Sequence, residues 1–200
     1  MKAVIFDLGN VLLYYDAQRA AKRFAKEAGV PIEKVWRHFF ISRVEKAYTR
    51  GEITTREFYL HAKQAFNSKI DFATFSELWN DIFWENRKIQ PLLKNLSRRY
   101  PLYLISNTNA LHFNHVRQKF PAVFRHFKKT FPSHVVGRRK PDPRIYRSVL
   151  KKIKLRPEEA VFIDDTPPFV EGARRVGMKA IHYRSETQLK RDLRKLGVKV

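Results

Sequence analysis

The hydrophobic pattern of this chain changes its period twice. Residues 2–6 form a short apolar run, rich in β-branched side chains, that ends at Asp7, as is typical of a buried parallel strand. From residue 16 to about residue 86, apolar positions recur at helical spacing. Beyond Pro91, short apolar runs alternate with amphipathic stretches, which is the pattern of a sheet built from βα units. The chain therefore predicts a strand, then a helical block, then an α/β region.

The helical block carries its own start and stop signals. Asp16 is a candidate N-cap for a helix that ends at Gly29. Pro31 suits the first turn of a second helix, and Thr54 with Glu57 forms a capping box for a third. We expect residues 16–86 to be helical throughout.

The α/β region predicts strands separated by helices. Strands are expected at 102–105, near Val135, at 160–163 and at 179–182, and helices after Pro91 and at 110–119, 143–152 and 170–176. The fold class is then α/β: a Rossmann-like parallel sheet core flanked by helices, with an inserted α-helical cap. Residues 1–15 and 87–200 are assigned to the core and residues 16–86 to the cap.

Composition narrows the chemistry. The chain has 200 residues, 44% of them hydrophobic and none of them cysteine, so we expect a folded protein without disulfides, thiolate metal sites or a cysteine nucleophile. No run approaches the roughly 18 apolar residues of a membrane span, and Asp7 interrupts the first run before it becomes a signal-peptide core. A cytoplasmic location without membrane contact is expected.

The net charge of +22 would attract polyanions at low salt. Residues 16–88 have a net charge of only +4, so the rest of the chain has a net charge of +18. Basic residues are scattered without a nucleic-acid recognition motif, which favours a generally basic, solvated surface, although a nucleic-acid partner stays possible.

Polar residues follow the predicted strands at their carboxyl ends, where ligands bind in parallel sheets. Asp7 follows the first strand, Ser106 and Asn107 follow a second, and Asp164 and Asp165 follow a third. Taken singly, each could be a cap or turn residue. Together they gather carboxylates, a hydroxyl and an amide at one edge of the sheet.

Four segments resemble the four motifs of the haloacid dehalogenase superfamily, in family order: VIFD ending at Asp7, LISN ending at Asn107, KPD beginning at Lys140, and FIDD ending at Asp165. The resemblance spans nearly the whole chain and includes the helical insert between the first and second motifs, as in the helical-cap subfamily I. It implies a Mg²⁺-dependent phosphatase that acts on a small phosphomonoester, such as a sugar phosphate, through an aspartyl phosphate.

The chemistry agrees with this resemblance. A carboxylate such as Asp7 can attack phosphorus and divide one difficult displacement into two easier ones. Repulsion between two anions then requires a cation, and carboxylates suit Mg²⁺. The resemblance implies that Asp7, Asp164, Asp165 and the backbone carbonyl of Gly9 bind the metal. It also implies that Ser106 and Asn107 hold phosphate oxygens and that Lys140 neutralises charge in the transition state.

Two positions depart from the family pattern. Phosphatases of this superfamily usually carry a second Asp two residues after the nucleophile to protonate the leaving group, and this chain has Gly9. The segment DLGNV that begins at Asp7 resembles the α-D-glucose-1-phosphate phosphatase-like branch. Asp16, Tyr14 or a residue of the helical block are candidates for the proton donor. Phe169 stands where relatives often have Asn.

Two alternatives stay open. A 2-haloacid dehalogenase needs no proton donor at Gly9, but it also needs no metal, and the Asp164–Asp165 pair favours phosphate chemistry. A weakly catalytic or non-catalytic module could instead bind polyanions through the basic surface. Most aromatic residues of the helical block are assigned to its core, and His112 with His115 to the surface of a helix. Oligomeric state and natural substrate are not predicted.

Overall fold

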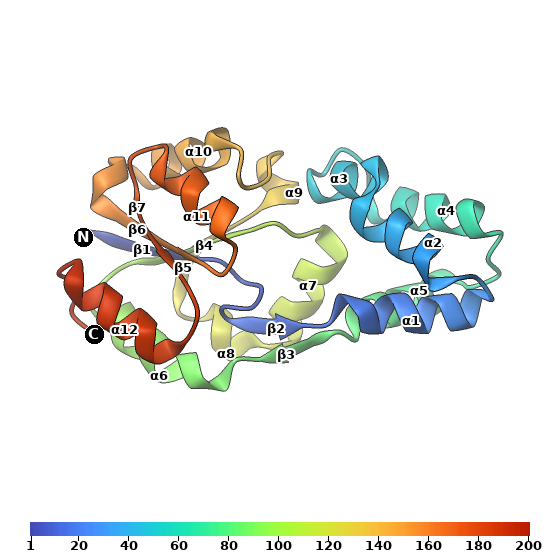
Figure 1. The fold of residues 1–200 in the computed structure, drawn as a ribbon, viewed down its shortest axis with the longest axis horizontal. Coiled ribbons are helices and arrows are strands. Elements are labelled where there is room, and N and C mark those ends of the chain that lie inside the picture. Colours follow the sequence, from blue (N-terminus) through green and yellow to red (C-terminus); the bar gives the residue numbers. More distant parts are fainter.

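The computed structural model describes residues 1–200, and its centre is a parallel five-stranded sheet (Figure 1). The strand order is β5-β4-β1-β6-β7, with every neighbouring pair parallel. The strands are β1 Ala3–Phe6, β4 Leu102–Ser106, β5 Phe127–Pro132, β6 Ala160–Asp164 and β7 Lys179–His182. The predicted α/β class with a Rossmann-like parallel core is confirmed.

Helices cover both faces of the sheet, as Figure 1 shows. They are α6 Gln90–Ser97, α7 Ala110–Lys119, α8 Pro121–Phe124, α9 Ser133–Val136, α10 Pro143–Ile153, α11 Pro167–Arg174 and α12 Glu186–Lys195, with 3₁₀ turns at Arg87–Ile89 and Pro157–Glu159. Successive residues of β1 serve opposite faces because side chains alternate along a strand. Val4 and Phe6 pack in the apolar cluster with α6 and α12, whereas Ala3 and Ile5 pack in the cluster with α10 and α11.

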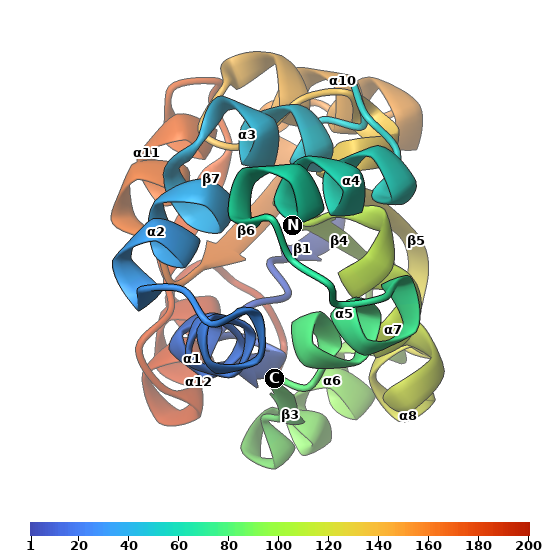
Figure 2. The ribbon, with the colours of Figure 1, turned by 90° about the vertical axis from the view of Figure 1, so that its right-hand side faces the viewer.

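A second group of helices lies beyond the carboxyl ends of the strands (Figures 1 and 2). It comprises α1 Ala17–Ala28, α2 Ile32–Trp36 with a π-helical turn at Arg37–Ile41, α3 Arg43–Thr49, α4 Thr55–Phe66 and α5 Phe72–Asn80. Its buried residues, from Ala20 to Ile82, form an apolar cluster separate from those of the sheet. Such a layer is placed to cover whatever binds at the strand ends. The boundaries at residues 15/16 and 86/87 stay a prediction.

The helix signals in the sequence lie where the structure uses them. Asp16 caps α1 by accepting a hydrogen bond from the backbone of Arg19, and Gly29 ends that helix with φ 65°. Thr54 and Glu57 form the predicted capping box at the start of α4. No helix in the structure is long and apolar enough to cross a membrane.

The expectation that residues 16–86 are wholly helical is wrong at its end. Phe83–Glu85 is a strand, β3, which pairs antiparallel with β2, Leu13–Tyr15. Each strand has only three residues, so neither shows a period, and the pairing joins segments about 70 positions apart. This two-stranded ribbon carries the chain between the sheet and the helical layer.

The strand expected near Val135 is also misplaced. The observed strand is β5, at the edge of the sheet, and its exposed Lys128 and Lys129 hide the apolar pattern. Val135 lies in the short helix α9 and is 69% exposed. An apolar, β-branched run is therefore an ambiguous signal when it is only two residues long, as at Val135 and Val136.

Candidate active site

Three neighbouring strands deliver the predicted site residues to one edge of the sheet. Asp7 follows β1 directly, Ser106 ends β4 and Asp164 ends β6. The register aligns Phe6 with Leu104 and Ile163, so the three strands end within two residues of one another. Asp7, Ser106 and Asp164 are all buried.

Lys140 reaches this edge from the loop before α10 and joins two of the carboxylates. Its Nζ lies 2.8 Å from Oδ1 of Asp7 and 2.6 Å from Oδ2 of Asp164, and its side chain is fully buried. One ammonium thus faces two carboxylates away from water. Lys140 lies 133 positions after Asp7 and 24 positions before Asp164 in the sequence, and the fold brings the three side chains together.

The carboxylates of Asp7, Asp164 and Asp165 lie together, each with an oxygen within 4.8 Å of the others. Oδ1 of Asp7 is buried and, although close to Lys140, has no hydrogen bond of good geometry. Burial raises the pKa of Asp7 to about 7. The charge of Lys140 lowers this pKa and the charge of Asp164 raises it, but burial has the largest effect. Three carboxylates against one ammonium leave an excess of two negative charges, which fits a divalent cation with oxygen ligands.

Asn107 serves the loop of Lys140. Its Oδ1 accepts a hydrogen bond from the Lys140 backbone N–H at 2.8 Å, and its Nδ2 donates to the Lys140 carbonyl at 2.9 Å. The side-chain amide therefore holds Lys140 in place as well as lying beside the cavity. This bonding was not foreseen from the sequence, which assigned Asn107 to phosphate alone.

The two departures from the family pattern can be located. Phe169, at the start of α11, places its ring centroid 5.0 Å from the Lys140 ammonium, so the aromatic ring supplies a cation–π contact there. Gly9 lies in the turn after Asp7. A Cβ atom at Gly9 would lie 2.9 Å from Cε1 of Tyr15, so that ring occupies the space of a side chain at position 9.

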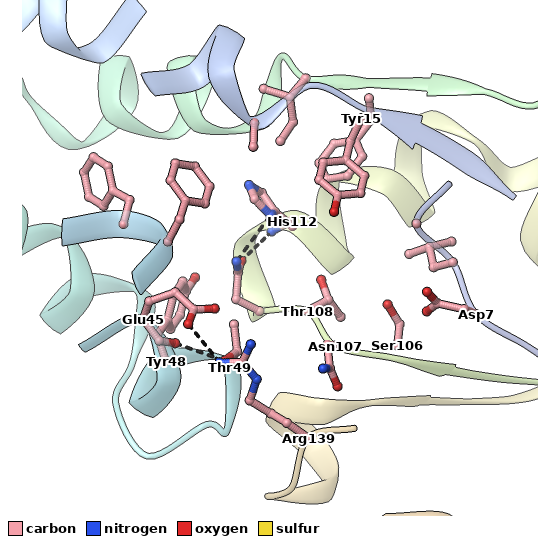
Figure 3. A pocket seen from close by; sticks show the side chains of 18 of the residues that line it. Asp7, Tyr15, Glu45, Tyr48, Thr49, Ser106, Asn107, Thr108, His112 and Arg139 are labelled. Carbon is pink, nitrogen blue, oxygen red and sulfur yellow. Dashed lines mark hydrogen bonds and ion pairs between the residues drawn. The ribbon is translucent and has the colours of Figure 1, made fainter. Parts of the chain in front are cut away.

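A cavity of about 270 Å³ opens above the strand ends (Figure 3). Asp7, Gly9, Ser106, Asn107 and Asp165 line its floor. The helical layer supplies much of the rest, including several of its aromatic side chains. An ion pair of 2.8 Å between Arg139 of the core and Glu45 of α3 lies at its side.

Sequence reasoning missed several residues of this cavity. Tyr15 follows Asp7 by eight positions, but only the return of the chain along β2 places it at the cavity. His112 was assigned to a helix surface, yet it lines the cavity and stacks on Trp79 at 5.1 Å. The aromatic residues of the helical layer do form its core, but some of them also form the cavity wall.

Comparison with known proteins agrees with this geometry. The profile of haloacid dehalogenase-like hydrolases matches residues 1–177. The sesquiterpene phosphatase astK of Aspergillus oryzae is 27% identical over 198 residues, covering 98% of this chain and 96% of that protein. The drimenol cyclase drtB of Aspergillus calidoustus is 29% identical over 96% of this chain, which spans only 36% of that larger protein.

Among solved structures, the enzyme bt-2542 of Bacteroides thetaiotaomicron matches with a TM-score of 0.88 and 26% identity, covering 96% of this chain and 98% of that one. The same enzyme has been solved in complex with magnesium and inorganic phosphate. A family profile that spans most of the chain, together with strand-end carboxylates in the arrangement described above, identifies this chain as a member of the haloacid dehalogenase-like hydrolase family.

Proposed function

We propose that this chain is a Mg²⁺-dependent phosphatase that hydrolyses a small phosphomonoester through an aspartyl phosphate on Asp7. The observation that carries the proposal is the buried cluster in which Asp7 lies beside Asp164, Asp165 and Lys140. A carboxylate surrounded by further carboxylates and a fixed ammonium suits attack on phosphorus with charge compensation. The magnesium-bound structure of a 26% identical relative supports the same choice of ion.

The roles of the residues follow from their positions. Asp7 supplies the attacking oxygen, and Lys140 stabilises charge that develops on the phosphoryl group. Ser106 and Asn107, which line the cavity, would hold phosphate oxygens. The carboxylates of Asp7, Asp164 and Asp165 and the carbonyl of Gly9 would hold Mg²⁺, which offsets repulsion between the carboxylate and the phosphate dianion.

The helical layer of residues 16–86 is proposed to act as the cap. It contributes the upper wall of the cavity and is joined to the core by the β2–β3 ribbon and by the Glu45–Arg139 ion pair. Closure over the strand ends would exclude water from the reacting groups. The substrate's organic group would then lie against this layer.

Magnesium binding provides the first test, because it can be measured without a substrate. At 100 times its dissociation constant, a ligand that binds only the folded state adds about 2.7 kcal/mol of stability. For a chain of this size we expect Tm to rise by roughly 5–10 °C on adding Mg²⁺. Asp165→Asn should reduce this rise, whereas Glu158→Gln, which removes the same charge from an exposed turn, should not.

Phosphate release completes this test. Acetyl phosphate, p-nitrophenyl phosphate and alkyl phosphates should be hydrolysed with Mg²⁺ and not with EDTA. No Mg²⁺ effect on either Tm or turnover would contradict the proposal. Halide release from 2-haloacids without metal would favour the dehalogenase alternative, and salt-dependent polyanion binding without any turnover would favour the binding alternative.

A further inference from the structure

The cavity has two chemically different ends. Its floor at the strand ends is lined by carboxylates, hydroxyls and amides. Its far end, formed by the helical layer, is apolar and mostly aromatic: Phe39, Phe40, Phe58, Trp79, Ile82 and Phe83. A molecule that fills it therefore meets polar groups at one end and hydrocarbon at the other.

The polar atoms near the apolar end already have partners. The Tyr48 hydroxyl pairs with Thr55 Oγ1 at 2.8 Å and accepts a hydrogen bond from the backbone of Leu111 at 3.2 Å. The Thr49 hydroxyl donates to the Glu45 carbonyl at 3.0 Å. The Thr49 hydroxyl proton is therefore already engaged, and a sugar hydroxyl finds no free donor on Thr49.

Both ring nitrogens of His112 also have hydrogen-bond partners. Its Nε2–H donates to the Trp79 carbonyl at 2.9 Å, and its Nδ1 accepts from the Asn109 amide at 3.3 Å. Burial lowers the pKa of His112 to about 4, so the ring is neutral near pH 7. Arg139 and Glu45, which the core and α3 contribute to the cavity lining, form an ion pair with each other. The wall presents one unpartnered buried donor, Nε1 of Trp79.

We propose that the apolar end holds the organic group of the substrate, and that the substrate is the phosphate ester of an apolar alcohol rather than of a sugar. This inference rests on the proposed phosphatase function. Every further methylene buried in the wall should tighten binding about fourfold. A polyol of the same length would lose its hydration without replacement.

Non-hydrolysable phosphonates test this inference independently of turnover. We expect calorimetry on the Mg²⁺-loaded protein to show octylphosphonate binding at least about 30-fold more tightly than methylphosphonate. Pentylphosphonate should bind more tightly than its hydroxylated counterpart, the phosphonate analogue of a pentitol phosphate. Phe40→Gln should weaken octylphosphonate about tenfold and leave methylphosphonate unchanged.

Leu60→Gln is the matched control, because Leu60 is exposed on α4 away from the cavity, and it should change neither affinity. Equal affinity along the alkyl series, or tighter binding of the hydroxylated compound, would overturn the apolar assignment. Such a result would say nothing against turnover of acetyl phosphate. The proposed phosphatase function and the apolar assignment can therefore fail separately.

A second inference comes from the space beside Gly9. The Tyr15 ring fills it: Cε1 and Cδ1 lie 2.9 and 3.4 Å from the position of a Cβ at residue 9. Tyr15 ends β2, pairs with Phe83 across the ribbon and lines the cavity. In Figure 3 its hydroxyl is directed into the cavity, on the side that holds Asp7 and Thr108. The Tyr15 ring thus fills the space beside the strand ends in which the family's second carboxyl side chain would begin.

The Tyr15 hydroxyl carries a proton that an alkoxide leaving group could take, because a phenol is a far stronger acid than an alkanol.

The geometry points to Tyr15 as the proton donor to the leaving oxygen in the proposed reaction. As the bond from Asp7 to phosphorus forms and the ester P–O bond breaks, the Tyr15 proton moves to the leaving oxygen, which departs as the alcohol. The phenolate then takes a proton from the water that attacks the aspartyl phosphate. Asp7 and Tyr15 are restored, and inorganic phosphate is released.

Tyr15→Phe separates this role from packing, because it keeps the ring beside Gly9. We expect turnover of alkyl phosphates to fall about 10²- to 10⁴-fold, and that of acetyl and p-nitrophenyl phosphate to fall less than about threefold. Tyr14→Phe, one position earlier on the same strand, should change neither.

Equal losses on all substrates in Tyr15→Phe would overturn the donor role, as would full activity on alkyl phosphates. Wild-type turnover of acetyl phosphate without turnover of any alkyl phosphate would also overturn it, since no proton donor would then be operating. Absence of turnover on acetyl phosphate would instead remove the proposed phosphatase function and this role with it.

Discussion

Replacing Asp7 with asparagine should reduce phosphate release by at least about 10⁴-fold, a loss typical of removing a nucleophile. The amide has nearly the same shape as the carboxylate but cannot attack phosphorus. The fold should persist, because Lys140 keeps its contact with Asp164. Burial raises the pKa of Asp7 to about 7, so its anion is disfavoured by folding and a neutral amide there should not lower Tm in EDTA.

Asp16→Asn is the matched control for this loss. Asp16 is exposed and caps α1, and asparagine caps helices equally well, so activity and Tm should both be unchanged. Initial rates with acetyl phosphate and an alkyl phosphate, in Mg²⁺, measure the effect. If Asp7→Asn kept more than about a tenth of the activity, the nucleophile would have to be another residue.

The sequence was sufficient to predict the sheet edge on which these experiments depend. Each of β1, β4 and β6 is an apolar run that stops at a polar residue, and parallel strands bring their carboxyl ends together. Asp7, Ser106 and Asp164 therefore meet for a reason that is visible in the pattern. The order of the motifs then singled out Lys140 from 41 basic residues.

What the pattern could not predict depends on non-local geometry. Asn107 holds the backbone of Lys140 across 33 positions, and no local signal marks that pairing. Tyr15 approaches Gly9 because the chain reverses at Asn10, which adopts a left-handed φ of 52°. Asparagine tolerates that conformation, so the turn is plausible from the sequence, but the direction of the returning strand is not.

The cavity wall was missed for a related reason. Apolar residues at helical spacing on α4 and α5 predict that one face is buried, without showing whether another residue or a ligand covers it. Phe58 and Trp79 do both, since they pack in the core of the helical layer and line the cavity. Only the three-dimensional arrangement distinguishes a cavity wall from a filled core.

Lys140→Met should destabilise the metal-free protein by about 3–5 kcal/mol, because it leaves two buried carboxylates facing each other without a cation. This corresponds to a fall in Tm of roughly 6–20 °C for a chain of this length. The loss should be smaller in Mg²⁺, which would supply the missing positive charge. Lys151→Met, on the exposed face of α10, should change stability by less than about 0.5 kcal/mol.

The double variant Asp7→Asn with Lys140→Met distinguishes charge repulsion from lost packing. If the destabilisation arises from the two stranded carboxylates, neutralising Asp7 should return part of the lost stability, and the double variant should unfold at a higher temperature in EDTA than Lys140→Met alone. If lost packing of the lysine stem were the cause, the second change would bring no recovery. Thermal unfolding of the wild type, Asp7→Asn, Lys140→Met and the double variant, with and without Mg²⁺, therefore measures the coupling between the proposed nucleophile and the buried ammonium.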